Sequence, residues 1–273
     1  MTILTTYSSE TMKKHLIDLT VKSVEHVHER YVLLRLTHDK PLPPMLPGQF
    51  VEVRVDGSPT TFLRRPISIN FVDTANNELW LLVATVGDGT RQMARLKEGD
   101  SLNCLLPLGN GFSSPNAASD SDLPLLVGGG VGVAPLLYLG ATLKEKGIRP
   151  TFLLGARTSR DLLMLSEFEK YGRVYVTTED GSQGEQGFVT NHSILSQEQF
   201  TIIQTCGPTP MMKAVARYAR QTGTPCEASL ENLMACGLGA CLCCVAKTTN
   251  GNLCVCKDGP VFNTDCLMWE REE

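Results

Sequence analysis

The sequence lacks a long apolar run and an excess of basic residues. No stretch approaches the roughly 20 apolar residues that a membrane-spanning helix requires, so no membrane contact is expected. The 25 Lys and Arg residues are outnumbered by 29 Asp and Glu, which gives a net charge of −4 and does not suggest a nucleic-acid partner. Residues 1–20 are polar and mixed, without an apolar stretch of signal-peptide length, so we expect a cytoplasmic protein.

Histidine is also scarce, and no Ser/His/Asp set marks a pocket for nucleophilic catalysis. None of the five histidines lies near a motif: they are His15, His26, His28, His38 and His192. Isolated histidines are more often surface or satisfied core residues than catalysts. We therefore expect bound cofactors to carry the difficult chemistry, with the chain positioning them.

Cysteine is nearly absent from the first 200 residues, where only Cys104 occurs. Eight of the ten cysteines lie between Cys226 and Cys266. Disulfides are rare in the cytosol, and thiols that cluster in a reducing compartment indicate a metal site. We therefore expect a metal centre near the C-terminus.

The length of 273 residues predicts two or three domains. Residues 1–19 are interpreted as a frayed or helical N-terminal extension. From residue 20 to 115 the pattern is that of β-structure: Val51–Val55 alternates apolar and polar residues, and Pro and Gly recur at short intervals. Short strands with this spacing predict a small antiparallel β-barrel.

Strands alternate with helices from about residue 120. This alternation predicts an α/β parallel-sheet nucleotide domain over residues 120–225, and the cysteines define a small C-terminal domain over 226–273. The predicted fold is therefore mixed. The expected strands are 123–127, 151–154, 173–177 and 201–205, and the expected helices are 134–146, 161–171 and 210–221.

The C-terminal cysteines follow the spacing Cys236-x4-Cys241-x2-Cys244, and Cys256 comes eleven residues later. This is the plant-type ferredoxin arrangement, in which four thiolates hold a [2Fe-2S] cluster. The glycines between the first two thiols let the backbone come close to the bridging sulfides. The spacing therefore predicts these four residues as cluster ligands.

A structural zinc site is the alternative, although zinc ribbons usually use two separated C-x2-C pairs and only Cys241 and Cys244 form one here. Cys243 and Cys254 lie off the pattern and are interpreted as bystanders. Two further thiols are interpreted as core residues: Cys226 and Cys266.

Two motifs in the β region are suited to a phosphate-bearing ligand. Arg65-Pro66-Ile67-Ser68 follows a strand, and arginine can make bidentate contacts with phosphate, while Ser68 can hydrogen-bond a flavin ring nitrogen. Gly89-Thr90 lies where a strand turns into a helix, and a helix N-terminus favours an anion. Short motifs are weak evidence on their own, so each has a plain alternative: residues 65–68 could be only a strand end, and Gly89-Thr90 only a simple turn.

Gly128-Gly129-Gly130-Val131-Gly132 joins a strand to a helix and would let a pyrophosphate approach the helix N-terminus. Glu179 and Asp180 end a later strand. An acidic residue there repels a 2′-phosphate and accepts from a free ribose hydroxyl, which favours NAD over NADP. Arg157 and Arg160 could meet a phosphate but are interpreted as solvated loop residues.

In this order, the segments resemble the ferredoxin–NADP reductase superfamily. The resemblance implies that Cys206-Gly207-Pro208 lies beside the nicotinamide, with Cys206 near the hydride path. It also implies FAD on the barrel, bound by Arg65, Pro66, Ile67, Ser68, Leu82, Val83, Ala84, Gly89 and Thr90.

Together with the cysteine segment, the chain resembles the electron-transfer subunits of NAD-dependent (class 1B) dihydroorotate dehydrogenases. The most specific part is residues 231–241, completed by 256–262. The resemblance implies a relay for pyrimidine biosynthesis in which a partner subunit with FMN oxidises dihydroorotate, electrons pass to the cluster, and FAD reduces NAD+. It also implies a heterotetramer with two copies of each chain.

Other interpretations remain open. The chain could be the reductase subunit of a hydrogenase, a sulfite reductase or a bifurcating NADH-dependent ferredoxin:NADP reductase. In the last of these the first cluster ligand tends to be aspartate, whereas Cys236 stands here. The non-catalytic alternative is a zinc-bearing binding module that has lost flavin.

Overall fold

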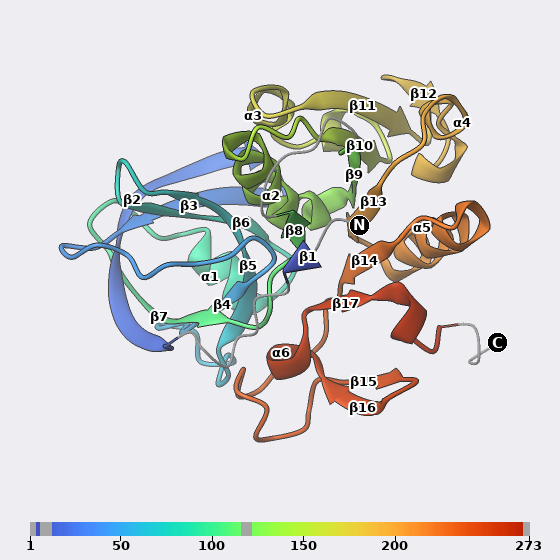
Figure 1. Cartoon of the computed structure of the whole chain (residues 1–273). Helices are drawn as coiled ribbons and strands as arrows, with labels where there is room; N and C mark the ends of the chain where they lie inside the picture. Colours follow the sequence, from blue (N-terminus) through green and yellow to red (C-terminus); the bar gives the residue numbers. More distant parts are fainter. Residues whose placement is uncertain (1–3, 6–12, 116–121, 270–273) are drawn as a thin grey trace.

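The computed structural model describes residues 4–5, 13–115 and 122–269. It consists of a β-barrel, a nucleotide-binding lobe and a cysteine lobe (Figure 1). The predicted mixed fold is confirmed. No helix in the described ranges is long and apolar enough to cross a membrane.

Six antiparallel strands close the barrel in the order β2-β3-β6-β5-β4-β7. Alternating Leu and Val side chains from these strands fill its interior, as the period-two pattern requires. The strands are β2 (His15–His28), β3 (Tyr31–Thr37), β4 (Phe50–Val53), β5 (Arg65–Asp73), β6 (Glu78–Ala84) and β7 (Ser101–Leu108).

The barrel begins earlier than predicted. Residues 15–19, expected to belong to a frayed or helical extension, are paired with β7 from His15↔Leu106 to Leu19↔Leu102. β1 (Leu4–Thr5) pairs with β8 (Ser114–Pro115), and the rest of residues 1–12 lies outside the described ranges. Leu19 is fully buried, so this segment is part of the barrel core.

The nucleotide-binding lobe is built on a seven-stranded sheet of order β12-β11-β10-β9-β13-β14-β17, parallel except for β17. The strands are β9 (Pro124–Gly129), β10 (Thr151–Ala156), β11 (Arg173–Thr178), β12 (Glu185–Gln186), β13 (Ile202–Cys206), β14 (Cys226–Ser229) and β17 (Val261–Asn263). The helices are α2 (Ala134–Glu145), α3 (Leu165–Glu169), α4 (Ile194–Gln197) and α5 (Thr209–Thr222).

The helix predicted over 161–171 is shorter than expected. Only α3 and a single 3-10 turn, Ser159–Asp161, form there. Leu162 is extended and Met164 has a left-handed φ of 56°, so the backbone between the two turns is not helical. The other two predicted helices agree with α2 and α5 within two residues.

The cysteine lobe is an excursion from the edge of the sheet rather than a separate terminal domain. β14, which carries Cys226, runs parallel to β13, and β17 returns antiparallel to β14. The predicted boundary at residue 226 therefore falls inside the nucleotide-binding sheet. Between these strands lie the cysteine loop, the hairpin β15 (Val245–Thr248) with β16 (Gly251–Cys254), and α6 (Val255–Asp258).

Side-chain hydrogen bonds hold the three lobes together. Asn70 Nδ2 on β5 donates to the carbonyl of Ala134 at 3.0 Å, and the hydroxyl of Tyr138 donates to the carbonyl of Met45 at 3.1 Å, so α2 packs on the barrel. On the side of the cysteine lobe, Asn110 Nδ2 donates to the carbonyl of Asp258 at 2.9 Å.

Candidate cofactor and nucleotide sites

The flavin segments predicted from the sequence meet at one end of the barrel. β5 begins and β6 ends there, because neighbouring strands of the barrel are antiparallel. α1 (Asp88–Met93) follows β6 directly. A Cβ atom on Gly89 would lie 3.2 Å from Arg65 Nε, so the Arg65 side chain passes close over the first turn of α1.

The strands β5 and β6 separate at this end. Their register pairs run from Asp73↔Glu78 to Ile69↔Leu81 and stop there. Beyond that point residues 65–68 pair with β4, and residues 82–84 pair with β3. The two segments therefore do not pair with each other along their facing edges, and a flavin bound between them could bond these backbone groups.

The two adjacent arginines differ in role. The Arg64 guanidinium donates to the carbonyl oxygens of Glu52 and Asn103, both at 3.1 Å, and so ties strands of the barrel together. Among the described residues, Arg65 donates only to carbonyls of the preceding two residues, at 2.9 and 3.2 Å. Of the two, Arg65 is therefore the arginine more available to a phosphate, and its role there stays a prediction.

The Thr90 hydroxyl closes the first turn of α1. It donates to the carbonyl of Gly87 and accepts from the Gly87 N–H, both at 3.1 Å. The hydroxyl therefore fixes the backbone of this turn. Among the other predicted flavin residues, Leu82 and Val83 are buried, and the rest of the set is half-buried except Gly89: Pro66, Ile67, Ser68 and Ala84.

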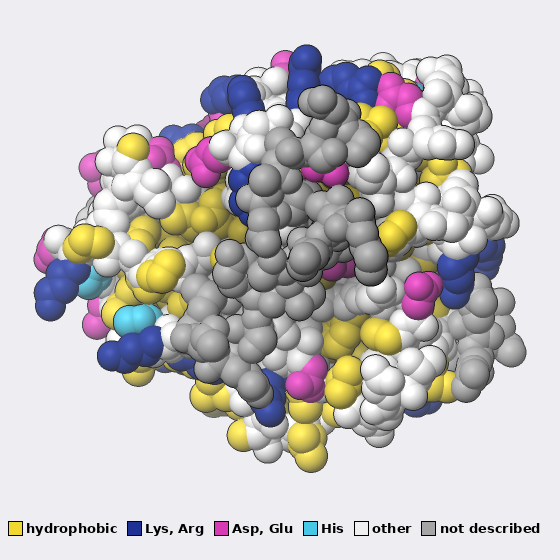
Figure 2. All heavy atoms as spheres, in the orientation of Figure 1, with side chains coloured by type: hydrophobic (Ala, Val, Ile, Leu, Met, Phe, Trp, Pro, Cys, Tyr) yellow, Lys and Arg dark blue, Asp and Glu magenta, His cyan; other side chains and the backbone are white. Residues whose placement is uncertain are grey.

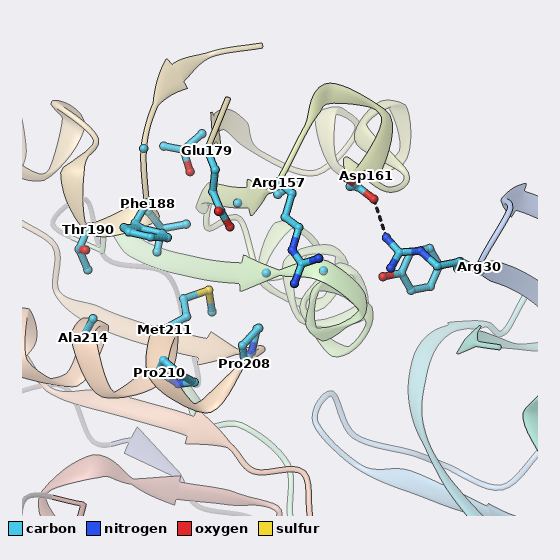
Figure 3. Close-up of a pocket in the computed structure, with 18 residues that line it drawn as sticks. Arg30, Arg157, Asp161, Glu179, Phe188, Thr190, Pro208, Pro210, Met211 and Ala214 are labelled. Carbon is cyan, nitrogen blue, oxygen red and sulfur yellow. Dashed lines mark hydrogen bonds and ion pairs between the residues drawn. The ribbon is translucent and has the colours of Figure 1, made fainter. Parts of the chain in front are cut away.

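A cavity of about 580 Å³ lies at the carboxyl ends of β9 and β13. From β9 the chain moves to β10 and β11 on one side of the sheet, whereas β13 and β14 lie on the other. A reversal of strand order leaves a crevice at the strand ends, where open α/β sheets bind nucleotides. Figure 3 shows Arg157 between Glu179 on one side and Arg30 on the other.

The glycines of the turn divide into two groups. Gly129 and Gly130 line the cavity. Gly128 and Gly132 instead permit packing: a Cβ on Gly128 would lie 2.9 Å from Val133 Cγ1, and one on Gly132 would lie 2.4 Å from the Cα of Gly207. Any side chain at position 132 would therefore push the turn away from β13.

The two acidic residues at the end of β11, Glu179 and Asp180, also differ in their position relative to the cavity. Glu179 lines the cavity, and Asp180 does not. The Asp180 carboxylate accepts from the backbone N–H and the hydroxyl of Ser182, at 3.0 and 2.6 Å, and these bonds lower its pKa. Of the two acidic residues, only Glu179 therefore faces the cavity.

Arg157, interpreted from the sequence as a solvated loop residue, lines the cavity although its side chain is exposed. Its guanidinium makes no ion pair with another residue of the described ranges. Three more cavity residues had no sequence signal: Phe188, which is 64% exposed, and Arg30 and Tyr31 from the β2–β3 hairpin. Only packing of the barrel on the sheet brings that hairpin here.

Cys206 ends β13 with its thiol buried, and it does not line the cavity, whereas Pro208 does. Burial strongly raises the pKa of this thiol, so it stays protonated at neutral pH. Pro208 therefore contributes to the cavity wall and Cys206 does not, and a place for Cys206 near the hydride path stays a prediction.

The four predicted cluster ligands form two neighbouring pairs. Cys236 is hydrogen-bonded to Cys241, and Cys244 to Cys256. Each iron of a [2Fe-2S] cluster takes two of the four thiolates, so two pairs are the arrangement it needs. Within the described ranges, no group of three or more His, Cys, Asp or Glu side chains is already arranged around a single metal-ion position.

Backbone N–H groups of the loop point at these sulfurs. Leu238 N donates to Cys236 Sγ at 3.3 Å, and Gly239 N donates to Cys256 Sγ at 3.1 Å. Burial opposes ionisation of Cys236, but hydrogen bonds from Leu238, Cys241 and Ala240 outweigh it and lower its pKa to about 6. The loop therefore stabilises a thiolate at neutral pH.

Two of the off-pattern thiols lie next to predicted ligands: Cys243 precedes Cys244 in the chain, and Cys254 packs with Cys244 and Cys256 in one buried cluster. Cys243 is exposed, with its Sγ 3.6 Å from the Leu233 carbonyl. Cys254 is buried in the β15–β16 hairpin opposite Val245. Cys226 is buried in β14, and Cys266 is half-buried. The interpretation of Cys243 and Cys254 as bystanders and of Cys226 and Cys266 as core residues stays a prediction.

Two family models match the chain. The model described as the iron-sulfur cluster binding domain of dihydroorotate dehydrogenase B matches residues 231–268. The model described as the oxidoreductase NAD-binding domain matches residues 126–217. The matched ranges contain the cysteine loop and the glycine turn respectively.

Among solved structures, the chain is similar to an NADH-dependent reduced ferredoxin-NADP oxidoreductase studied for flavin-based electron bifurcation. The TM-score is 0.80 and the identity 30%, over 93% of this chain and 90% of that one. A cytochrome b5 reductase domain of Ulva prolifera nitrate reductase shares the fold, with a TM-score of 0.62 and 18% identity, over 77% of this chain and 94% of that one.

Two relatives carry the name dihydroorotate dehydrogenase B (NAD(+)), electron transfer subunit. The protein from Shouchella clausii is 43% identical over 79% of this chain and 84% of its own length. The protein from Bacillus velezensis is 39% identical over 90% of this chain and 96% of its own length. At this identity and coverage, the chain belongs to the family of dihydroorotate dehydrogenase B electron transfer subunits.

Proposed function

We propose that this chain moves electrons from an FMN-containing dihydroorotate dehydrogenase subunit through a [2Fe-2S] cluster and FAD to NAD+. One observation carries the proposal: the cysteine loop packs on the barrel beside the flavin segment. Gly237, next to Cys236, lies against Glu52 of β4, whose register partner is Pro66. A cluster and a flavin held at these positions would be neighbours, as electron transfer requires.

The nucleotide cavity reaches the flavin segment from another direction. Tyr31 lines the cavity and is the register partner of Ala84 at the end of β6. A nicotinamide in the cavity and a flavin between β5 and β6 would therefore approach each other near Tyr31. The cluster and NAD+ would then approach the flavin from different directions.

When bound, FAD joins the one-electron chemistry of the cluster to the two-electron chemistry of NAD+. Arg65 would bind its diphosphate, and the open edges of residues 65–68 and 82–84 would hold its ring. The four paired thiols would hold the cluster, with the loop N–H groups stabilising their charge. Glu179 would accept from a ribose hydroxyl and disfavour a 2′-phosphate.

The partner is proposed to dock over the cysteine loop. Three large hydrophobic side chains stand out from this lobe: Leu233, Leu238 and Leu242 are 84%, 46% and 66% exposed. Figure 2 shows hydrophobic side chains at the lower edge of the molecule, where the loop lies in Figure 1. Exposed apolar groups of this kind favour a protein interface, and Cys241 is exposed among them. We expect a heterotetramer with two copies of each chain, in the cytoplasm.

The test is reconstitution with the host's FMN-containing subunit, followed by an anaerobic assay of NAD+-dependent orotate formation. Activity that appears only when both chains are present supports the proposal. A yellow-brown protein that NADH bleaches, but that neither co-purifies with the partner nor supports orotate formation, contradicts it. Reconstitution is repeated with Cys241→Ser, which removes a predicted cluster ligand, and with Cys243→Ser as its matched control, since both thiols are exposed in the same loop.

A further inference from the structure

The carboxyl group of Glu52 is buried without a partner. The residue is 0% exposed, and neither Oε1 nor Oε2 has a hydrogen-bond partner in the described ranges. The Arg64 guanidinium donates to the backbone carbonyl of Glu52 instead. Buried carboxylates are normally paired, because desolvation of an unpaired one is costly. A residue that only filled space here would be better apolar.

Glu52 lies between the two proposed cofactor sites. On β4 it is the register partner of Pro66 in the flavin segment. From the other side the cysteine loop presses on it: a Cβ on Gly237 would lie 2.7 Å from Glu52 Cγ and 3.1 Å from Oε1. Gly237 has a φ of 68°, which together with this contact explains why glycine follows Cys236.

The charges that act on Glu52 come from the same two segments. Burial is the main cause that raises its pKa to about 7; Arg64 and Arg65 lower the pKa, and the thiolate of Cys236 raises it. Gly237, whose Cβ position would lie 3.1 Å from Glu52 Oε1, directly follows Cys236, so a negative charge on Glu52 also acts on the first ligand of the cluster. Reduction adds an electron to the cluster that Cys236 would hold, and a nearby negative charge opposes this reduction.

We propose that Glu52 tunes electron transfer between flavin and cluster: its buried carboxylate, placed beside Cys236, lowers the reduction potential of the cluster. The residue acts through the cluster ligand and touches no substrate, so it is a positioning residue rather than a catalytic one. This inference rests on the proposed function, because it requires both cofactors to be bound.

The test is a potentiometric titration of the anaerobic holoprotein at pH 9, followed by the EPR signal of the reduced cluster. Glu52→Gln keeps the size of the side chain and removes its charge. We expect the ratio of reduced to oxidised cluster at a fixed potential to rise about tenfold, which is about 59 mV for a one-electron couple. Glu52→Asp keeps the charge and should stay near the wild-type value.

Glu78→Gln is the matched control, since Glu78 is also buried in the barrel but is paired with Lys22. Its cluster potential should not change. Glu52→Leu is a second variant that removes the charge together with the unpartnered polar atoms, so it should fold and load even where the Gln variant loads poorly. Its cluster potential must also rise.

An unchanged potential in either loaded Glu52 variant overturns the inference, and so does an equal rise in Glu78→Gln. Iron and flavin contents are measured on each protein to establish loading. A wild-type protein that binds neither cofactor would instead overturn the proposed function. The two failures are therefore distinguishable.

Discussion

The guanidinium of Arg30 donates a 2.8 Å hydrogen bond to the carboxylate of Asp161, which joins the barrel to the nucleotide-binding lobe beside the cavity (Figure 3). His28 Nε2 lies 3.8 Å from the same carboxylate. Burial opposes ionisation of Asp161, but hydrogen bonds from Thr158 and Arg30 outweigh it and lower its pKa. The pair therefore places a cation from the barrel at the edge of the nucleotide site.

Removing this cation should weaken nucleotide binding. We expect Arg30→Ala to raise the KM for NADH about two- to fivefold in a diaphorase assay with an artificial acceptor, in keeping with the small free energies of exposed charge interactions. Asp161→Asn retains the cation and should not raise it. An unchanged KM in Arg30→Ala would show that the pair serves only to join the lobes.

The cluster assignment predicts opposite results for two exposed thiols of one loop. Cys241→Ser should lose the iron-sulfur absorbance and the EPR signal of the reduced cluster, because a ligand is removed. Flavin reduction by NADH should persist. Cys243→Ser should retain the cluster. If both variants keep it, or if only Cys243→Ser loses it, the ligand set is wrong.

Nucleotide preference should depend on one of two adjacent acidic residues. Glu179→Gln removes a negative charge from the cavity, so kcat/KM for NADPH should rise about tenfold, equivalent to about 1.4 kcal/mol. Asp180→Asn should change it little, because that carboxylate accepts from Ser182 outside the cavity. Steady-state rates with both nucleotides test this, and a larger effect at position 180 would contradict the pocket geometry.

Partner docking and nucleotide binding should respond separately to two exposed apolar residues. Leu233→Glu puts a charge into the proposed interface, so co-purification with the FMN-containing subunit should fall, while the diaphorase KM for NADH stays unchanged. Phe188→Ala should do the reverse, because Phe188 lines the nucleotide cavity. Loss of co-purification in both variants would indicate general misfolding, which thermal melts of each protein detect.

Glu52 should make stability depend on pH. Its pKa is raised from 4.5 to about 7, mainly by burial, so the folded protein binds more protons than the unfolded chain between these values. The stabilising contribution is complete below pH 4.5 and is lost as pH rises through 7. Glu52→Leu should therefore remove on the order of 2 kcal/mol of this decline between pH 5.5 and 8. Unfolding midpoints of holoproteins at both pH values measure it, and parallel declines would contradict the prediction.

The sequence by itself determined the order of the lobes and the glycine turn, and it was enough to predict the cysteine ligand set. These depend on local features: the period of apolar residues, the spacing of thiols along one loop, and glycines where backbones must come close. Arg65-Pro66-Ile67-Ser68 and Gly89-Thr90 could also be recognised, because each is a continuous segment, the first at the start of β5 and the second in the first turn of α1.

Only the tertiary structure decided which of two neighbouring residues faces a site. Arg64 turns to Asn103 while Arg65 stays available, and Asp180 turns to Ser182 while Glu179 faces the cavity. It also brought together residues far apart in the chain: Arg30 with Asp161, and Glu52 with Gly237. Such contacts follow from strand register and from the packing of lobes on one another, and a local pattern contains neither.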